Sequence, residues 1–140
     1  MNGTPVTLVT GATGHLGANL VRRLLSDGHR VRVLLRPGRP TAAIDGLDVE
    51  RAIGDLRDPS SLARTVDGCA RVFHCAAMIS IVGGGEHDVF ETNVLGTRHL
   101  LAAAARAGVV RVVVTGSFSA VGYQPGRPSD ERDPFNPFDR

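Results

Sequence analysis

Short runs of apolar, often β-branched residues alternate along the chain with segments whose apolar residues recur every three or four positions. The runs are typical of strands buried on both faces, and the spaced segments are typical of helices that pack one side against a sheet. The sequence therefore predicts five strands, at residues 6–10, 31–35, 49–53, 71–75 and 109–115. It predicts helices at residues 15–27, 59–66 and 86–107, with a further short helix allowed within residues 40–47.

The regular alternation of strands and helices indicates the fold class. It predicts an α/β protein with a doubly wound parallel sheet and helices on both faces. Right-handed crossovers leave few topologies and favour the strand order 3-2-1-4-5, with a ligand crevice between strands 1 and 4. The pattern stops after residue 121, and four prolines in residues 122–140 indicate a loop there.

Three glycines follow the first strand directly and open the next helix, at the spacing G-x-x-G-x-x-G. The first suits a tight turn, the second lets a pyrophosphate approach the backbone, and the third allows the helix to pack closely on the sheet. The helix N-terminus offers free N–H groups and a partial positive charge to the anion. The sequence thus predicts a dinucleotide-binding turn whose ligand contacts are Gly11, Thr13, Gly14, His15, Leu16 and Gly17.

The residue after the second strand decides between the two nicotinamide dinucleotides in such sites. An acidic residue there binds the ribose 2′-hydroxyl of NAD, whereas an arginine suits the 2′-phosphate of NADP. This chain has Arg36 at that position and Arg39 close by, with no acid in residues 31–36. NADP is therefore favoured as the cofactor, with NAD as the alternative.

The stretch Thr-Gly-Ala-Thr-Gly-His-Leu-Gly at residues 10–17 resembles the signature of the extended short-chain dehydrogenase/reductases, also called the NAD-dependent epimerase/dehydratases. The resemblance extends over the whole chain, because further matches occur in the family's order. It implies a Rossmann-like fold and hydride transfer between nicotinamide and a carbonyl or hydroxyl carbon of a small-molecule substrate.

Two segments at strand ends match the family's cofactor-binding steps. Gly54-Asp55-Leu56 resembles the Gly-Asp-Leu/Val step, whose aspartate accepts a hydrogen bond from the adenine amino group; Asp58 is the better cap for the following helix and leaves Asp55 free. His74-Cys75-Ala76-Ala77 is similar to the His-x-Ala-Ala motif, whose small residues let the backbone pass close under the cofactor. We therefore predict cofactor contacts at Asp55, Leu56, Cys75, Ala76 and Ala77. His74 could be read as a base, but we expect a structural role.

Two later segments complete the resemblance. Asn93 with Gly96 and Thr97 matches an Asn-x-x-Gly-Thr segment that helps to shape the active-site backbone, and we place Asn93 with the cofactor site. Thr115-Gly116-Ser117 is similar to the family's Thr-Ser-Ser step, with glycine in place of the first serine. The resemblance assigns Thr115 to the cofactor site and Ser117 to polarising the substrate; Ser119 is an alternative, because the spacing of this motif varies.

The family's acid/base pair, Tyr-x-x-x-Lys on one helix face, has no match in this chain. There is no lysine, and Tyr123 is followed by Gln-Pro-Gly, which excludes a helix. Residues 130–137 resemble the family loop that precedes the catalytic tyrosine. We therefore expect residues 1–121 to be an incomplete NAD(P)-binding domain and residues 122–140 to lead to a missing catalytic helix and substrate domain. A chain truncated there would be inactive by itself.

The leading hypothesis is thus an NAD(P)-dependent oxidoreductase or epimerase, with a reductase of the dihydroflavonol or hydroxysteroid type favoured over a nucleotide-sugar epimerase. The alternative is a non-catalytic NAD(P)-binding sensor or regulatory domain. A net charge of +2 gives no reason to expect a nucleic-acid partner, and Cys69 and Cys75 fit no zinc spacing, so no metal site is predicted. We expect a cytoplasmic protein without membrane contacts and, at full length, possible homodimers.

Overall fold

The chain folds around one parallel sheet in a computed structural model that describes residues 5–80, 85–117, 120–122 and 125–134. Every neighbouring pair of strands is parallel, and the order is β3-β2-β1-β4-β5. The predicted order 3-2-1-4-5 is therefore confirmed. The strands are β1 (Val6–Thr10), β2 (Arg30–Leu35), β3 (Glu50–Ile53), β4 (Cys69–His74) and β5 (Arg111–Val114).

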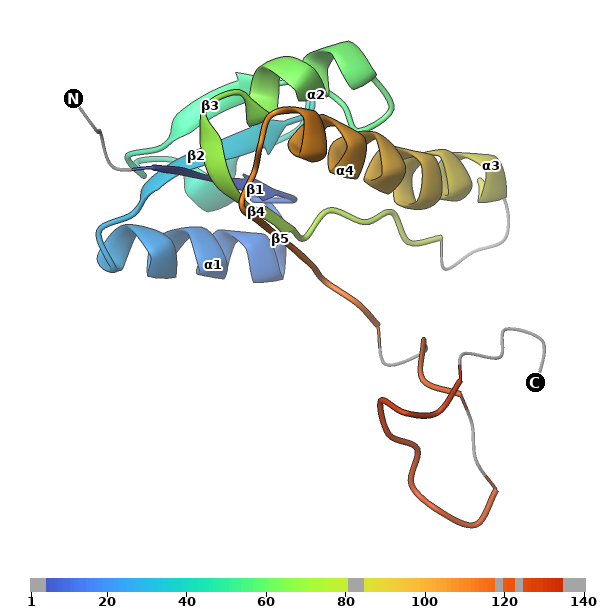
Figure 1. The fold of residues 1–140 in the computed structure, drawn as a ribbon. Helices are drawn as coiled ribbons and strands as arrows, with labels where there is room; N and C mark the ends of the chain where they lie inside the picture. Colours follow the sequence, from blue (N-terminus) through green and yellow to red (C-terminus); the bar gives the residue numbers. More distant parts are fainter. Residues whose placement is uncertain (1–4, 81–84, 118–119, 123–124, 135–140) are drawn as a thin grey trace.

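Helices cover both faces of the sheet. Helix α1 lies on one face, whereas α2, α3 and α4 lie on the other, and the chain after β5 runs away from this layered body (Figure 1). A single 3₁₀ turn occupies the connection between β2 and β3, where a short helix was allowed. The helical segments are α1 (His15–Ser26), η1 (Ala42–Ile44), α2 (Pro59–Val66), α3 (Glu86–Phe90), η2 (Glu91–Leu95) and α4 (Gly96–Arg106).

The core consists of two apolar clusters, one on each face of the sheet. Leu8 of β1 belongs to the cluster beneath α2 and α4, whereas the next residue, Val9, belongs to the cluster beneath α1. Successive side chains of a strand point to opposite faces, so a strand that is apolar throughout feeds both clusters. This is why the central strand β1 is buried along its whole length.

Four strands begin or end at residues other than those predicted. β2 begins at Arg30 instead of residue 31 and β3 at Glu50 instead of 49, whereas β4 spans Cys69–His74 instead of 71–75 and β5 spans Arg111–Val114 instead of 109–115. Val109 is apolar and β-branched, but its N–H donates to the carbonyl of Ala104 at 3.0 Å and so closes the C-terminus of α4. The Val109 N–H is thus used in the helix cap and is not available for pairing within the sheet. The apolar pattern alone does not show which of the two bonds forms.

The helix predicted at residues 86–107 contains a π-helical turn. Residues Glu91–Leu95 have the wider π geometry between α3 and α4. Gly96 follows that turn, and a Cβ on it would lie 2.8 Å from the Cβ of Leu56. Gly96 is thus packed closely against the loop that follows β3.

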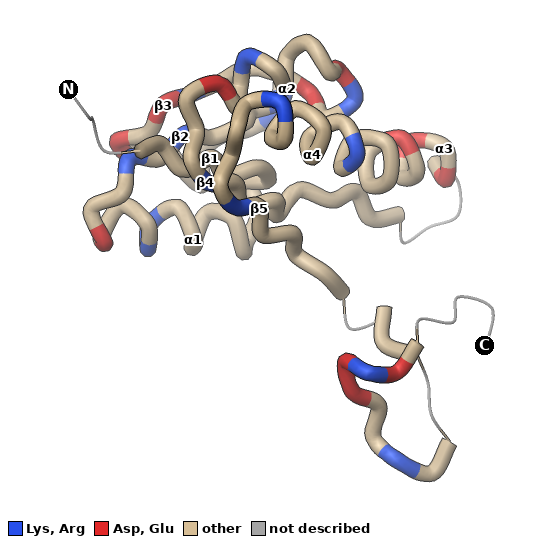
Figure 2. Tube along the Cα trace, viewed as in Figure 1, with Lys and Arg blue, Asp and Glu red and all other residues tan. Residues whose placement is uncertain are grey.

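Arginine side chains add polar links between neighbouring elements. All sixteen basic residues are arginines, and within the described part of the chain arginine and acidic positions are spread over several helices, strands and loops (Figure 2). Arg32 of β2 donates to Glu50 of β3 at 2.8 Å and to the carbonyls of Thr65 and Asp67 at 2.9 and 2.6 Å. One planar guanidinium, with five donors, thus ties two strands to the end of α2. No helix in the described part of the chain is long and apolar enough to cross a membrane.

Candidate functional site

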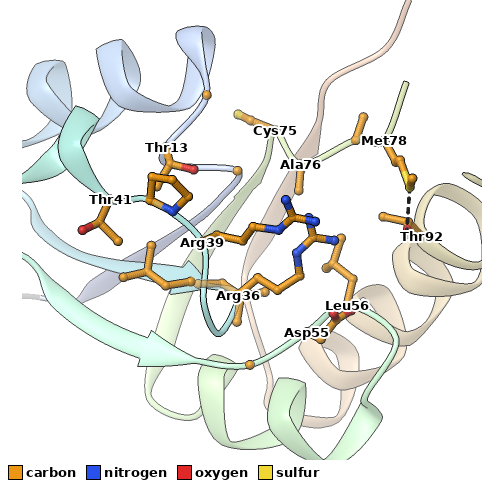
Figure 3. A pocket seen from close by; sticks show the side chains of 17 residues that line it. Thr13, Arg36, Arg39, Thr41, Asp55, Leu56, Cys75, Ala76, Met78 and Thr92 are labelled. Carbon is orange, nitrogen blue, oxygen red and sulfur yellow. Dashed lines mark hydrogen bonds between the residues drawn. The ribbon is translucent and has the colours of Figure 1, made fainter. Parts of the chain in front are cut away.

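A cleft of about 320 Å³ opens at the carboxyl ends of the strands. Segments that follow β1, β2, β3 and β4 form its walls, so it includes the predicted crevice between strands 1 and 4 and extends across β2 and β3 (Figure 3). In open α/β sheets, ligands bind where the strand order reverses, at these carboxyl ends. The lining residues are Gly11, Thr13, Gly14, Leu34, Leu35, Arg36, Arg39, Pro40, Thr41, Gly54, Asp55, Leu56, Cys75, Ala76, Ala77, Met78 and Thr92.

Two of the three motif glycines after β1, Gly11 and Gly17, lie where the folded chain has no room for a side chain. Gly11 has φ +68°, and a Cβ there would lie 2.6 Å from the amide nitrogen of Ala76. A Cβ on Gly17 would lie 2.1 Å from the carbonyl oxygen of Gly11. Gly11 therefore brings the turn against the end of β4, and Gly17 packs α1 against the turn itself, instead of against the sheet as predicted.

Gly14 is under no such constraint. Its φ is −82°, and a Cβ on it would approach only the carbonyl oxygen of Gly11, at 3.4 Å. The folded chain by itself therefore tolerates a side chain at this position, which lines the cleft. Gly14 is also the N-cap of α1 and provides no side-chain cap, so the first N–H groups of this helix keep their capacity to bind an anion.

The structure separates the predicted contacts of this turn into two groups. Gly11, Thr13 and Gly14 line the cleft. His15 and Leu16 are exposed in the first turn of α1, and Gly17 is buried against the turn; none of these three lines the cleft. Those residues would therefore contact a ligand only through the backbone N–H groups of this first helical turn.

Two arginines from the loop after β2 reach into the cleft. The side chains of Arg36 and Arg39 both extend toward its centre (Figure 3). A turn joins their backbones, because the N–H of Arg39 donates to the carbonyl of Arg36 at 3.3 Å. Within the described ranges neither arginine forms an ion pair. The cleft thus contains two positive charges that form no ion pair with a described carboxylate, although the charge of Arg36 acts on the Asp55 carboxyl. Two such arginines suit a phosphate.

Asp55 lines the cleft and does not cap α2, but its carboxylate already has a hydrogen-bonding partner. Asp58 caps α2 through the N–H of Ser60 at 2.9 Å, as expected, whereas the Asp55 carboxylate accepts hydrogen bonds from Arg57. Burial tends to raise the pKa of the Asp55 carboxyl, but the hydrogen bonds from Arg57 and the charges of Arg57 and Arg36 outweigh it and hold this pKa below its ordinary value. Asp55 is therefore ionised at neutral pH and can only accept hydrogen bonds.

His74 is a structural residue in a buried hydrogen-bond network. Its Nδ1 lies 2.7 Å from the hydroxyl of Thr10, and its Nε2 lies 2.9 Å from the hydroxyl of Thr97. The N–H of Ala76 also donates to Thr10 Oγ1, at 3.3 Å. Burial lowers the pKa of His74, so the ring is neutral at physiological pH. The network joins the ends of β1 and β4 to α4 and supports the expected structural role.

The segment after β4 forms the wall of the cleft opposite Arg36. Cys75, Ala76 and Ala77, which the sequence predicts as cofactor contacts, line it. Asn93 lies behind this wall: its Oδ1 accepts from the N–H of Met78 and its Nδ2 donates to the carbonyl of Met78, both at 2.8 Å. Asn93 thus fixes the backbone of this wall and does not itself line the cleft.

Thr115 and Ser117 lie beyond the end of β5 and outside the cleft lining. The N–H of Thr115 donates to the carbonyl of His74 at 3.0 Å, which continues the pairing of β5 with β4 past the strand end. Ser117 follows two residues later and is exposed. The alternative serine, Ser119, and the lone tyrosine, Tyr123, lie outside the described residues.

Several lining residues were not found from the sequence. Thr92, only 8% exposed, enters the cleft from the π-helical turn, and its hydroxyl lies 4.0 Å from the sulfur of Met78 (Figure 3). No sequence signal marks that turn. Pro40 and Thr41 belong to the loop that carries both arginines. The length of that loop was the sequence feature that could have indicated that they line the cleft.

Comparison with protein families gives one match over nearly the whole chain. The model of the NAD dependent epimerase/dehydratase family matches residues 7–140. Among curated proteins, "Sterol demethylase protein B" of Methylococcus capsulatus is 53% identical over 95% of this chain and 40% of its own length. A "putative dihydroflavonol 4-reductase" of Synechocystis sp. is 41% identical over 88% of this chain and 36% of its own length. The chain therefore spans about 40% or less of these relatives.

A solved structure shows the same architecture. A short-chain dehydrogenase/reductase superfamily protein from Agrobacterium tumefaciens, crystallised with bound NAD, is 35% identical. The two structures superpose with a TM-score of 0.72 over 82% of this chain and 33% of the other. The cleft described above thus lies in a fold that holds a nicotinamide dinucleotide in a relative.

Proposed function

Because the chain belongs to the NAD dependent epimerase/dehydratase family, we propose that its cleft binds NADP for hydride transfer to or from a carbonyl or hydroxyl carbon. Members of this family are NAD-dependent dehydrogenases, reductases and epimerases, and the Agrobacterium relative holds NAD. The assignment of NADP to this chain depends on its own residues, as does the assignment of each part of the dinucleotide to a part of the cleft.

The observation that carries the proposal is the unconstrained glycine at position 14. Neither its φ angle nor a neighbouring atom within 3.4 Å requires a glycine, yet it lines the cleft beside the N-terminus of α1. A ligand that lies against the backbone of this turn would collide with a Cβ at position 14. A pyrophosphate fits this position, since the N–H groups of the first helical turn and the helix dipole both favour an anion.

The remaining lining residues fit the other parts of NADP. Arg36 and Arg39 would hold the ribose 2′-phosphate through charge-assisted hydrogen bonds. The Asp55 carboxylate would accept the adenine amino group, beside Leu56. Cys75, Ala76 and Ala77 present small side chains on the opposite wall, where the dinucleotide would pass toward Ser117.

When bound, the nicotinamide supplies or accepts the hydride. The chain's own residues would bind the cofactor and orient the reacting carbon, and Ser117 would donate a hydrogen bond to the substrate oxygen. The names of the relatives above refer to a sterol and a dihydroflavonol. We therefore favour a polycyclic alcohol or ketone, of the dihydroflavonol or hydroxysteroid type, over a nucleotide sugar as the substrate class.

A calorimetric titration of the chain with NADP and with NAD tests the cofactor assignment. We expect NADP to bind at least about tenfold more tightly, because each charge-assisted hydrogen bond to the 2′-phosphate contributes about 1.5–3 kcal/mol. The preference should shrink as salt is added, since the arginines are exposed. Tighter binding of NAD than of NADP would contradict the NADP assignment.

A further inference from the structure

Arg57 holds the Asp55 carboxylate from two directions. The backbone N–H of Arg57 donates to Asp55 Oδ1 at 2.9 Å, and its Nε donates to the same oxygen at 3.2 Å. Its Nη2 donates to Asp55 Oδ2, also at 3.2 Å. The guanidinium thus meets the carboxylate side-on, in the two-bonded geometry that fixes the plane of both groups.

The guanidinium is also held from its other edge. Nη1 of Arg57 lies 3.7 Å from Asp88 Oδ1 in α3, and the charge of Glu91 adds to the attraction. Arg57 is partly exposed, at 43% of its side chain, and does not line the cleft, whereas the Asp55 side chain is 23% exposed and does. Arg57 therefore acts on the cleft through Asp55 and not by direct contact with a ligand.

The hydrogen bonds from Arg57 occupy most of the acceptor positions of the Asp55 carboxylate. A carboxylate oxygen has two lone pairs. Oδ1 uses both for Arg57, and Oδ2 uses one. One acceptor position on Oδ2 remains, and the carboxylate has no proton to donate.

We propose that Arg57 is a positioning residue that makes Asp55 a fixed, acceptor-only reader of the base, selective for a 6-aminopurine over a 6-oxopurine. An amino group donates to the free acceptor position of Oδ2. A carbonyl at the same place would bring two acceptors together, because the ionised carboxylate has no proton to donate. The N1–H donor of a 6-oxopurine lies at the adjacent ring position, and a carboxylate fixed by Arg57 cannot turn to accept from it. The proposal rests on the proposed function, in which the adenine of NADP lies beside Asp55.

The test compares NADP with its hypoxanthine analogue, nicotinamide hypoxanthine dinucleotide phosphate, in which a carbonyl replaces the amino group. Dissociation constants of both are measured for the wild-type chain and for Asp55→Asn, Arg57→Leu and Arg57→Lys. Arg23→Leu serves as the matched control, because Arg23 pairs with its own aspartate, Asp27, on α1 and does not line the cleft. Thermal unfolding of each variant confirms that it is folded.

We expect wild type to bind NADP roughly 100-fold more tightly than the analogue, as sites built around one hydrogen-bonding group discriminate strongly. Asp55→Asn should lower this ratio at least about tenfold, because an amide can turn its N–H₂ toward the carbonyl. Arg57→Leu should lower it at least about threefold, Arg57→Lys should give an intermediate ratio, and Arg23→Leu should leave it unchanged.

Three results would overturn the inference. An unchanged ratio in both Arg57 variants would show that Arg57 does not position Asp55, and a wild-type ratio near one would show that Asp55 does not read the base. Equal weakening of both dinucleotides by Arg57→Leu would indicate a merely structural role. If wild type binds neither dinucleotide, the proposed function itself fails, which is a distinguishable outcome.

Discussion

Replacing Gly17 with alanine should destabilise the whole fold, whereas the same replacement at Gly14 should leave the chain folded and weaken its binding of NADP. A Cβ on Gly17 would lie 2.1 Å from the carbonyl oxygen of Gly11 and 2.9 Å from the Cα of Ala12. These are backbone atoms, so only a shift of α1 away from the turn could relieve the overlap. We expect a loss of about 3 kcal/mol or more in the free energy of unfolding, a large part of the total for a domain of this size.

Gly14→Ala is the matched partner of that variant, since both glycines belong to the same turn and receive the same methyl group. Its cost to folding should stay within about 1 kcal/mol, because alanine accepts φ −82° and the remaining cost is that of a poorer N-cap. Its cost to NADP affinity should be at least about tenfold, since the methyl group keeps the pyrophosphate from the helix N-terminus.

Urea unfolding followed by circular dichroism measures the first effect, and calorimetry with NADP measures the second. A Gly17→Ala chain as stable as wild type would show that the turn is not packed as described. A Gly14→Ala chain with wild-type affinity for NADP would show that no ligand lies close to that glycine.

Replacing Arg36 with aspartate should reverse the cofactor preference. The arginine points into the cleft, as Arg39 does (Figure 3), and has no described ion-pair partner, so its charge is available to the 2′-phosphate. A carboxylate at this place would repel the phosphate and accept a hydrogen bond from the 2′-hydroxyl of NAD. We expect the ratio of NADP to NAD affinity to fall at least about 100-fold, because an attractive contact becomes a repulsive one.

Arg39→Asp should shift the ratio in the same direction but less, as Arg36 remains in place. Arg98→Asp is the control for the change of two charge units, because Arg98 is exposed on α4 and outside the cleft. Calorimetric titration with both dinucleotides gives the ratios. If Arg36→Asp and Arg98→Asp shift the ratio equally, the effect comes from overall charge and not from a contact at residue 36.

The sheet could be predicted from the sequence because its signals are local and agree with one another. β1 consists of valine, leucine and threonine and is mostly β-branched, and the glycine spacing that follows it specifies a turn and a helix start. Handedness then restricts the strand order to few choices. The strand ends were predicted less well, since Val109 fits a strand by composition but its N–H closes the end of α4.

The cleft was predicted only where its residues belong to contiguous motifs. Thr92 was missed because a π-helical turn, which has no sequence signature, places it in the cleft. The role of Arg57 was missed because it depends on a side chain that folds back onto Asp55 and reaches Asp88, far along the chain. Asn93 was associated with the cofactor, but the structure shows its amide bound to the backbone of Met78. Such contacts depend on tertiary geometry.

The most direct test of the central claim, that NADP lies across this cleft, is a map of backbone amide chemical shifts during titration with NADP. The largest changes should occur in residues 11–17 at the glycine turn, in residues 36–41 around the two arginines, and at Asp55 and Leu56. NAD should reproduce the changes at the turn and give weaker ones at residues 36–41, because it has no 2′-phosphate. Shifts concentrated on another surface, or none at saturating NADP, would contradict the account.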